Sequence, residues 1–287
     1  MLLEEYLKKH YCSSTAKAYY REIILFLANL TTAPKATYKE LTEYIGRLRL
    51  RYQNPKTIKR TVAAIKVYYS YLVDSEIRED NPAKSIRLRD RLSNDIQLQE
   101  LFTQQELESL LEKRCRYRLL ESRNKVLLSL LIHQAPLVLE LERLKVEDID
   151  LEGGSIIISG TAKTHRRVLP LKSKQIMLVY GYLKECRPKL LCGKESDLFF
   201  VGNQGAAMQG EEMSKLIKRN YENCFESRKV TAQSIRQSVI ANLLKSGKEL
   251  RIVQTFAGHK YPGATERYCQ SNTEALKSAI CRCHPMR

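Results

Sequence analysis

A polar run from Lys84 to Gln99 follows the dipeptide Asn81-Pro82 and divides the chain into two parts. Proline disfavours helical backbone in the residue before it, so the helical pattern that precedes this dipeptide has to end there. With 287 residues the chain is long enough to build two cores. We therefore predict an N-terminal domain over residues 1–83, a linker over 84–100 and a second domain over 101–287.

The first part has the sequence pattern of a helical domain. We expect helices over residues 2–10, 13–30 and 39–51, and a fourth that begins at Asn54-Pro55, where asparagine is a good cap and proline suits the first turn. Apolar residues follow helical spacing along the fourth helix, at Ile58, Val62, Ile65, Tyr69 and Leu72. Basic residues fall on its other faces, at Lys56, Lys59, Arg60 and Lys66. These four side chains are either candidate contacts to phosphates or a solvated face.

The second part mixes helices with three short strands. Thr103 and Glu106 match a capping box, with Thr103 as the cap of a helix, and we expect the second domain to start close to Leu101. Alternating apolar residues predict strands over 146–151, 154–159 and 167–171, and the last two are joined by a basic hairpin tip that contains Lys163, His165 and Arg166. Helices are expected over 122–131, 137–144, 172–185, 210–224, 233–246 and 249–257. The fold class is therefore mainly α with one small antiparallel sheet.

The charge balance points to a polyanionic partner. The chain has 49 Lys and Arg against 32 Asp and Glu, a formal net charge of +17, which favours nucleic acid over a membrane surface or a merely solvated basic surface. No apolar run approaches the ~20 residues that span a bilayer, and the start of the chain lacks the pattern of a signal peptide. We expect a cytoplasmic protein without a membrane partner.

The eight cysteines are scattered without paired C-x-x-C spacing, which is typical of free thiols in a reducing compartment. Cys281, Cys283 and His284 near the C-terminus are too few ligands for a metal site. The sequence therefore predicts no metal and no cofactor.

The candidate chemistry lies in the stretch from Gln254 to Tyr268, which contains His259 directly after a glycine. A phenol loses its proton only near pH ~10, so a reactive tyrosine needs cations or acid/base groups around it. The alternative is that Tyr268 is one of 16 tyrosines that pack in the fold.

Several ordered motifs resemble the tyrosine recombinases, the family of the phage integrases and Xer proteins. They are Leu-x-x-Glu-Asp-Ile-Asp, the lysine hairpin, Ile235-Arg236, Ala257-Gly258-His259 and Thr265-Glu-Arg-Tyr268. The similarity covers almost the whole chain. It implies a helical core-binding domain and an α+β catalytic domain that clamp duplex DNA, with no metal in the chemistry.

The resemblance also implies roles for single residues. Tyr268 matches the nucleophile that forms a 3′-phosphotyrosine and releases a 5′-hydroxyl. Arg236 matches the second catalytic arginine, and His259 matches a phosphate-contacting position. Lys163 matches the hairpin lysine that protonates the leaving oxygen, with His165 as a possible helper.

Two positions depart from the family pattern. Leu137 stands where the Gly-Leu-Arg-x-x-Glu-Leu run has its first arginine, and Gln233 stands where the His-x-x-Arg motif has its histidine. Leucine cannot bind phosphate, and glutamine can hydrogen-bond a phosphate oxygen but cannot carry a proton. We hypothesise that Arg143 or His133 supplies the missing cation.

The resulting hypothesis is a site-specific recombinase of a mobile element that acts as a tetramer on two paired DNA sites. The segment 273–280 is short and amphipathic, and it either docks on a neighbouring subunit or packs on its own domain. A catalytically impaired paralogue that only binds DNA is the alternative. A relaxing activity like that of type IB topoisomerases is a third reading.

Overall fold

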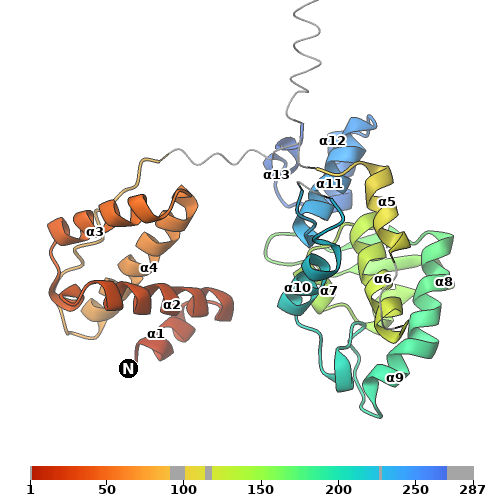
Figure 1. The fold of residues 1–287 in the computed structure, drawn as a ribbon, viewed down its shortest axis with the longest axis horizontal. Coiled ribbons are helices and arrows are strands. Elements are labelled where there is room, and N and C mark those ends of the chain that lie inside the picture. Colours follow the sequence, from red (N-terminus) through yellow and green to blue (C-terminus); the bar gives the residue numbers. More distant parts are fainter. Residues whose placement is uncertain (1, 91–100, 114–117, 226–227, 270–287) are drawn as a thin grey trace, which may run out of the picture. The chain divides into compact units, whose positions relative to one another are not determined.

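The computed structural model describes residues 2–90, 101–113, 118–225 and 228–269. The chain divides into two compact units, Met1–Asn94 and Asp95–Arg287 (Figure 1). The predicted fold class is confirmed, because both units are mainly helical and the second adds a three-stranded antiparallel sheet. Each unit has its own hydrophobic core.

Within the described residues 2–90, the first unit has four α-helices. They are α1 (Leu3–His10), α2 (Ser13–Asn29), α3 (Tyr38–Arg51) and α4 (Pro55–Asp74). The side chain of Asn54 caps α4 by accepting from Lys56 N at 2.9 Å, as its sequence predicts. Helix α4 packs against the other three helices, and the buried Tyr69 on it donates to the carbonyl of Ala33 at 2.6 Å. Helix α4 is therefore the central helix of the first unit, and the hydrophobic core forms around it.

The first residues of the polar run pack on this unit. Ile86 is buried in its core, and the Lys66 ammonium donates to the Ile86 carbonyl at 2.6 Å. Arg49 forms an ion pair with Asp90 at 2.9 Å. Residues 91–100, the rest of the predicted linker, lie outside the described residues.

The second unit is built around α6 (Arg118–His133), whose residues from Arg123 to Ile132 are almost all buried. Helices α5 (Gln104–Glu112), α8 (Ser173–Gly181) and α11 (Ala232–Lys245) contact α6. The other helices are α7 (Val138–Glu142), α9 (Arg187–Leu191), α10 (Gly210–Tyr221), α12 (Leu250–Ala257) and α13 (Gly263–Glu266). A π-helical turn, Tyr182–Cys186, links α8 to α9.

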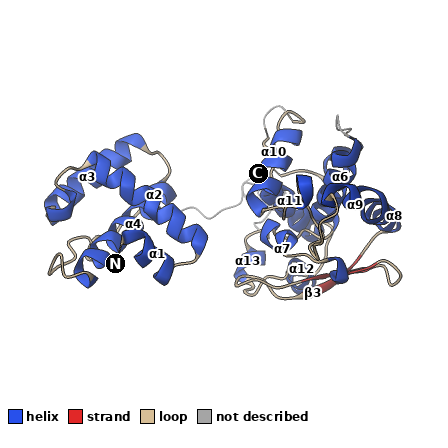
Figure 2. Cartoon of the chain, turned by 90° about the horizontal axis from the view of Figure 1, so that it is seen from below, coloured by secondary structure: helices blue, strands red, loops and turns tan. Residues whose placement is uncertain are grey.

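The sheet has the order β1-β2-β3, with strands Ile149–Asp150, Ser155–Ile158 and Arg167–Pro170. Ile156 pairs with Leu169 across β2 and β3, and Figure 2 shows the strands on one side of the helical unit. The prediction of a strand over 146–151 is wrong in its first half, because Val146–Asp148 is a 3₁₀ turn. The Asp148 carboxylate accepts from Lys145 N at 2.9 Å, and this local bond competes with strand pairing.

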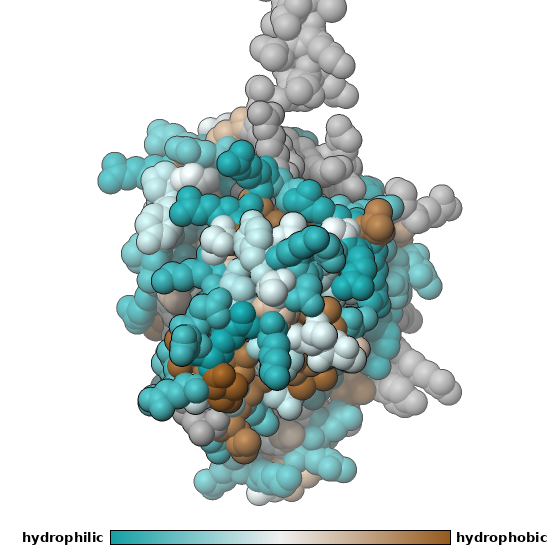
Figure 3. All heavy atoms as spheres, turned by 90° about the vertical axis from the view of Figure 1, so that its left-hand side faces the viewer, coloured by the Kyte–Doolittle hydropathy of each residue, from teal (hydrophilic) through white to brown (hydrophobic). Residues whose placement is uncertain are grey.

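The face of the molecule in Figure 3 is mostly hydrophilic, with hydrophobic side chains gathered in its lower part. In the ranges that the structure describes, no helix combines the length and the apolar character that a membrane crossing requires.

Candidate active site

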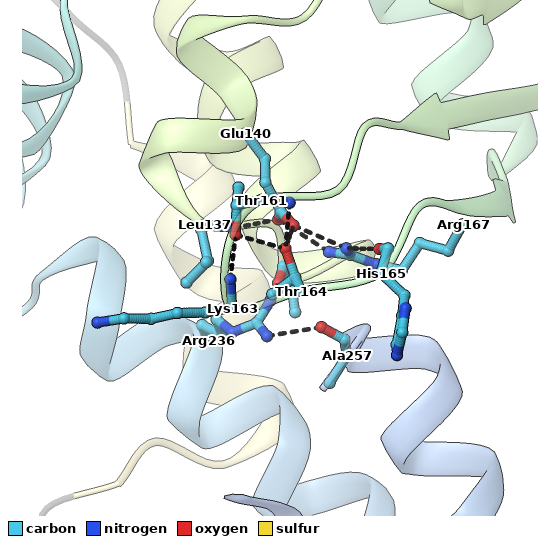
Figure 4. Close-up of polar contacts among 10 residues, drawn as sticks. Leu137, Glu140, Thr161, Lys163, Thr164, His165, Arg167, Arg236 and Ala257 are labelled. Atoms are coloured by element: carbon cyan, nitrogen blue, oxygen red, sulfur yellow. Dashed lines mark hydrogen bonds and ion pairs between the residues drawn. The ribbon is translucent and has the colours of Figure 1, made fainter. Parts of the chain in front are cut away.

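Arg236 lies at the centre of the site, on helix α11, which begins at a capping threonine. Thr231 accepts from Ser234 N at 2.9 Å and thereby begins α11. One turn later Arg236 is buried, and its guanidinium donates to the carbonyls of Ala135 and Ala257, the latter at 2.6 Å (Figure 4). Burial lowers the pKa of Arg236 to about 10, so the side chain keeps its charge at pH 7.

A second buried arginine pairs with a buried carboxylate close by. Glu140 on α7 accepts from both terminal nitrogens of Arg167 on β3, at 2.8 and 3.0 Å. It also accepts from the Thr164 hydroxyl at 2.6 Å and from Leu137 N at 2.7 Å. Burial acts to raise the pKa of Glu140, but the bonds from Arg167 and its other partners outweigh burial and leave the pKa below its usual value. Glu140 is therefore a fixed anion that joins α7 to the hairpin.

The β2–β3 hairpin carries Lys163 at an exposed position, and the Lys163 side chain extends away from the buried cluster (Figure 4). Behind the tip, Thr164 forms an antiparallel bridge with His259, and His165 N donates to the Gly258 carbonyl at 2.8 Å. The hairpin therefore rests on the turn that follows α12.

His259 is oriented by the segment that leads to the tyrosine. Its Nδ1 lies 2.8 Å from the hydroxyl of the buried Thr265 on α13. Burial, with Arg236 and Arg167 nearby, lowers the pKa of His259 to about 4. The imidazole is therefore neutral at pH 7 and is able to donate one hydrogen bond and accept another.

Tyr268 follows α13 and is half-buried against a small apolar cluster of Ile240, Val253 and Ala257. Burial raises the pKa of Tyr268 above its usual value, although the charge of Arg236 and a hydrogen bond with Gln237 act in the opposite direction. The phenol is thus protonated at pH 7, next to the cation that is able to stabilise a phosphate.

Three predicted site residues, Arg236, His259 and Tyr268, meet in space, and Thr164 links the Lys163 hairpin to them. Gln233 is exposed, one helical turn before Arg236. Arg143 is exposed directly after α7.

His133 ends α6, where Lys172 and Glu108 are its charged neighbours. Burial lowers the pKa of His133 to about 4, so it is neutral at pH 7.

The basic residues predicted to contact DNA differ in their contacts. Lys56, Lys59, His165 and Arg166 are exposed. Arg60 forms an ion pair with Glu22 at 2.7 Å. The ammonium of Lys66 is bound to backbone carbonyls of the first unit.

Sequence reasoning missed four residues of this site, namely Glu140, Thr164, Arg167 and Gln237. Glu140 is a single carboxylate inside the apolar run from Leu137 to Leu141, and such a residue signals a buried pair. The other three adjoin residues of the quoted motifs, but their partners are distant in sequence. Across the described ranges, no group of three or more His, Cys, Asp or Glu side chains is placed to hold a metal, and Cys281, Cys283 and His284 lie outside those ranges.

Comparison with known proteins gives two family matches. The model of the phage integrase family matches residues 100–275, and that of the phage integrase N-terminal SAM-like domain matches residues 2–76. Tyrosine recombinase XerD of Listeria innocua serovar 6a is 25% identical over 285 residues, which cover 97% of this chain and 95% of the relative. XerD of Proteus mirabilis is 29% identical over 230 residues, 79% and 71% of the two chains.

Two solved structures share the fold. The XerH site-specific recombinase bound to palindromic difH substrate, a post-cleavage complex, gives a TM-score of 0.72 at 22% identity and covers 92% of this chain and 78% of that one. The Tn1549 transposon integrase in complex with transposon right end DNA gives 0.67 at 17% identity, over 99% of both chains.

Proposed function

The chain belongs to the phage integrase family of tyrosine recombinases, and from this premise we propose that Tyr268 is the residue that attacks the DNA. The chain is an enzyme of site-specific DNA recombination, which cuts and rejoins DNA strands. The observation that supports Tyr268 is its position beside Arg236, a buried cation whose hydrogen-bond partners are neutral carbonyls.

Cleavage is a transfer of one phosphoryl group. The Tyr268 oxygen forms a bond to phosphorus while the bond from phosphorus to the 5′ oxygen breaks, and the products are a 3′-phosphotyrosine and a 5′-hydroxyl. The phosphodiester energy is retained in the tyrosine ester, so rejoining by the reverse reaction needs no nucleotide cofactor. The phenolic proton leaves to water, because Gln233 has no basic nitrogen that could accept it.

Arg236 and His259 bind the phosphate as charge builds up on its oxygens. The planar fork of Arg236 suits two non-bridging oxygens. If the Thr265 hydroxyl donates to Nδ1 of His259, the Nε2 proton is left to donate to a third oxygen. Lys163 protonates the departing 5′ oxygen from the hairpin tip.

The cation missing at Leu137 is assigned to Arg143. Arg143 ends the short helix that begins after Leu137, whereas His133 carries no charge at pH 7. Arg143→Ala is therefore expected to slow cleavage, and His133→Gln is its matched control. Unchanged cleavage by Arg143→Ala would remove Arg143 from the site.

The chain acts on double-stranded DNA in the cytoplasm as a tetramer. Exposed Lys56 and Lys59 on α4 and His165 and Arg166 on the hairpin support phosphate contacts. Arg60 and Lys66 join them by exchanging their present partners for phosphate. The segment 273–280, which we assign to subunit contacts, lies outside the described residues.

The assignment of Tyr268 is tested with a nicked suicide substrate that carries the chain's target site. The wild-type protein should form a covalent adduct, and Tyr268→Phe should form none while it still binds the DNA. Tyr261 is 75% exposed and lies in the same segment, so Tyr261→Phe is the matched control and should keep the adduct. An adduct that survives Tyr268→Phe would refute the assignment, and binding without any adduct by the wild type would favour the impaired paralogue.

A further inference from the structure

Lys163 lies in a two-residue turn whose backbone is fixed although its side chain is exposed. Thr161 and Thr164 exchange backbone hydrogen bonds of 3.0 and 3.3 Å across the turn, and Lys163 N donates to the Thr161 hydroxyl oxygen at 3.1 Å. At the base of the turn, a Cβ on Gly160 would lie 2.8 Å from the Thr164 carbonyl oxygen, so only glycine fits there. The turn therefore holds the Cα of Lys163 in one place.

The Thr164 hydroxyl connects this turn to α7. It donates to Glu140 at 2.6 Å, because a carboxylate only accepts. It accepts from Thr161 N at 3.1 Å and, since its single proton is already used, from the Thr161 hydroxyl at 2.9 Å. Thr164 is 3% exposed, and its hydroxyl has no hydrogen-bonding capacity left. Such a saturated buried hydroxyl specifies one position for the hairpin tip.

Thr164 also joins the hairpin to the segment that carries the other site residues. Its backbone forms the antiparallel bridge with His259, and His259 in turn contacts Thr265, three residues before Tyr268. The same threonine thus fixes the position of Lys163 relative to both Glu140 and His259.

We propose that Thr164 is a positioning residue for strand cleavage. Its hydroxyl bond to Glu140 fixes the backbone of Lys163, and from this fixed point the exposed side chain, which extends away from the buried cluster, turns so that its ammonium reaches the departing 5′ oxygen. The inference rests on the proposed role of Lys163 as the proton donor. In that step the ammonium gives one proton to the 5′ oxygen as its bond to phosphorus breaks, and a neutral amine remains. A loosened hairpin presents the ammonium less often, so the displacement slows because its leaving oxygen is protonated less readily, while the groups that bind the phosphate, Arg236 and His259, are untouched.

The prediction is specific to the leaving group. A substrate with sulfur in place of the bridging 5′ oxygen expels a thiolate, which needs no proton because a thiol has a pKa of only ~8.5. Lys163→Ala should therefore cleave the normal DNA at least ~100-fold more slowly and the sulfur substrate close to the wild-type rate. Thr164→Val, which keeps the shape and loses the hydroxyl, should show the same pattern with a loss of about 10- to 100-fold.

Three further variants complete the experiment, which uses the full chain and single-turnover cleavage of both substrates. Thr164→Ser keeps the hydroxyl and should cleave both at near the wild-type rate. Thr161→Val removes the hydrogen bond to Lys163 N and should show the same cleavage pattern as Thr164→Val. Agreement between these two independent variants means that the pattern does not come from a folding defect in one of them. Arg236→Ala should be slow on both substrates, because charge on the phosphate has to be stabilised with either leaving group.

The outcomes distinguish the role of Lys163 as the proton donor from the role of Thr164 as its positioning residue. If the sulfur substrate rescues Lys163→Ala but neither threonine variant, Thr164 only supports the fold and the inference is wrong. If Lys163→Ala is not rescued, the assignment of Lys163 fails and the inference fails with it, while the assignment of Tyr268 stands on its own adduct test.

Discussion

Glu140 binds Arg167 through both carboxylate oxygens, at 2.8 and 3.0 Å, with side-chain exposures of 0% and 4%. A buried pair of this kind costs most when one partner is removed, because the other charge is then buried without compensation. The pair therefore couples the hairpin strand to α7 far more strongly than an exposed ion pair would.

Arg167→Met is expected to destabilise the second unit by about 3–5 kcal/mol, since it leaves the buried Glu140 carboxylate without its ion-pair partner. Glu140→Met should cost a similar amount, and the double variant should cost clearly less than the sum of the two. Urea unfolding at pH 7 measures all three. Additive losses would show that the two charges do not depend on each other.

Leu137→Arg is expected to raise the rate of strand cleavage, because it places a cation at the position that the sequence resemblance assigns to the first arginine of the family. A preorganised charge-stabilising donor is commonly worth about 3–4 kcal/mol, so the gain should lie between about 100-fold and 1000-fold. Leu137→Met is the control for the loss of the leucine shape and should give no gain. Equal rates for the arginine and methionine variants, at equal DNA binding, would mean that the site no longer uses a cation there.

The stability of the second unit should fall as the pH is lowered from about 6.5 to about 4. The folded protein holds the pKa of His259 and of His133 at about 4, by burial first, whereas an unfolded histidine titrates near pH ~6.5. The unfolded chain then binds more protons in this window, so unfolding becomes easier as the pH falls, and these two groups add no slope above pH ~6.5. Urea unfolding at several pH values measures the slope.

With His133→Gln, unfolding between about pH 6.5 and pH 4 should bind roughly one proton fewer than in the wild type, and cleavage should be unchanged. His259→Gln should flatten the slope similarly but also slow cleavage. A wild-type slope in either variant would show that the corresponding imidazole is not kept neutral by the fold.

Gly258→Ala should destabilise the second unit and slow cleavage. Gly258 has a φ of 70°, and an added Cβ would lie 2.6 Å from the Arg167 guanidinium. Gly247→Ala is a matched control, since Gly247 has a φ of 80° but an added Cβ there meets nothing within 4 Å. Both variants carry the left-handed backbone cost of about 1–2 kcal/mol, so thermal unfolding and cleavage assays should show the extra loss only for Gly258→Ala.

Local signals predicted much of the fold. Asn54 and Thr103 cap the helices that the sequence assigned to them, because a cap depends only on residues three or fewer positions away. The strand expected over 146–151 failed at its start, where Asp148 bonds to Lys145 N and closes a turn. Apolar alternation carries no information about such a competing bond.

The candidate site was predictable in its residue types and not in its pairings. Arg236, His259 and Tyr268 came from ordered motifs, and the structure brings them together. Arg167 and Glu140 are 27 residues apart in the sequence, and their pairing depends on how β3 packs beside α7. No local sequence pattern therefore predicts it. The same limit applies to Arg60, which was a candidate for phosphate contact and is bound to Glu22.

Arg236 and Arg167 are both buried, but their electric fields at the site differ. Arg167 faces a full negative charge, and the two charges largely cancel a short distance away. Arg236 donates to the backbone carbonyls of Ala135 and Ala257. These carbonyls satisfy its hydrogen bonds but carry no net charge, so the positive charge of Arg236 is not neutralised. A positive potential therefore persists beside Tyr268 before any DNA arrives, and small anions from the buffer should compete with the scissile phosphate at this point.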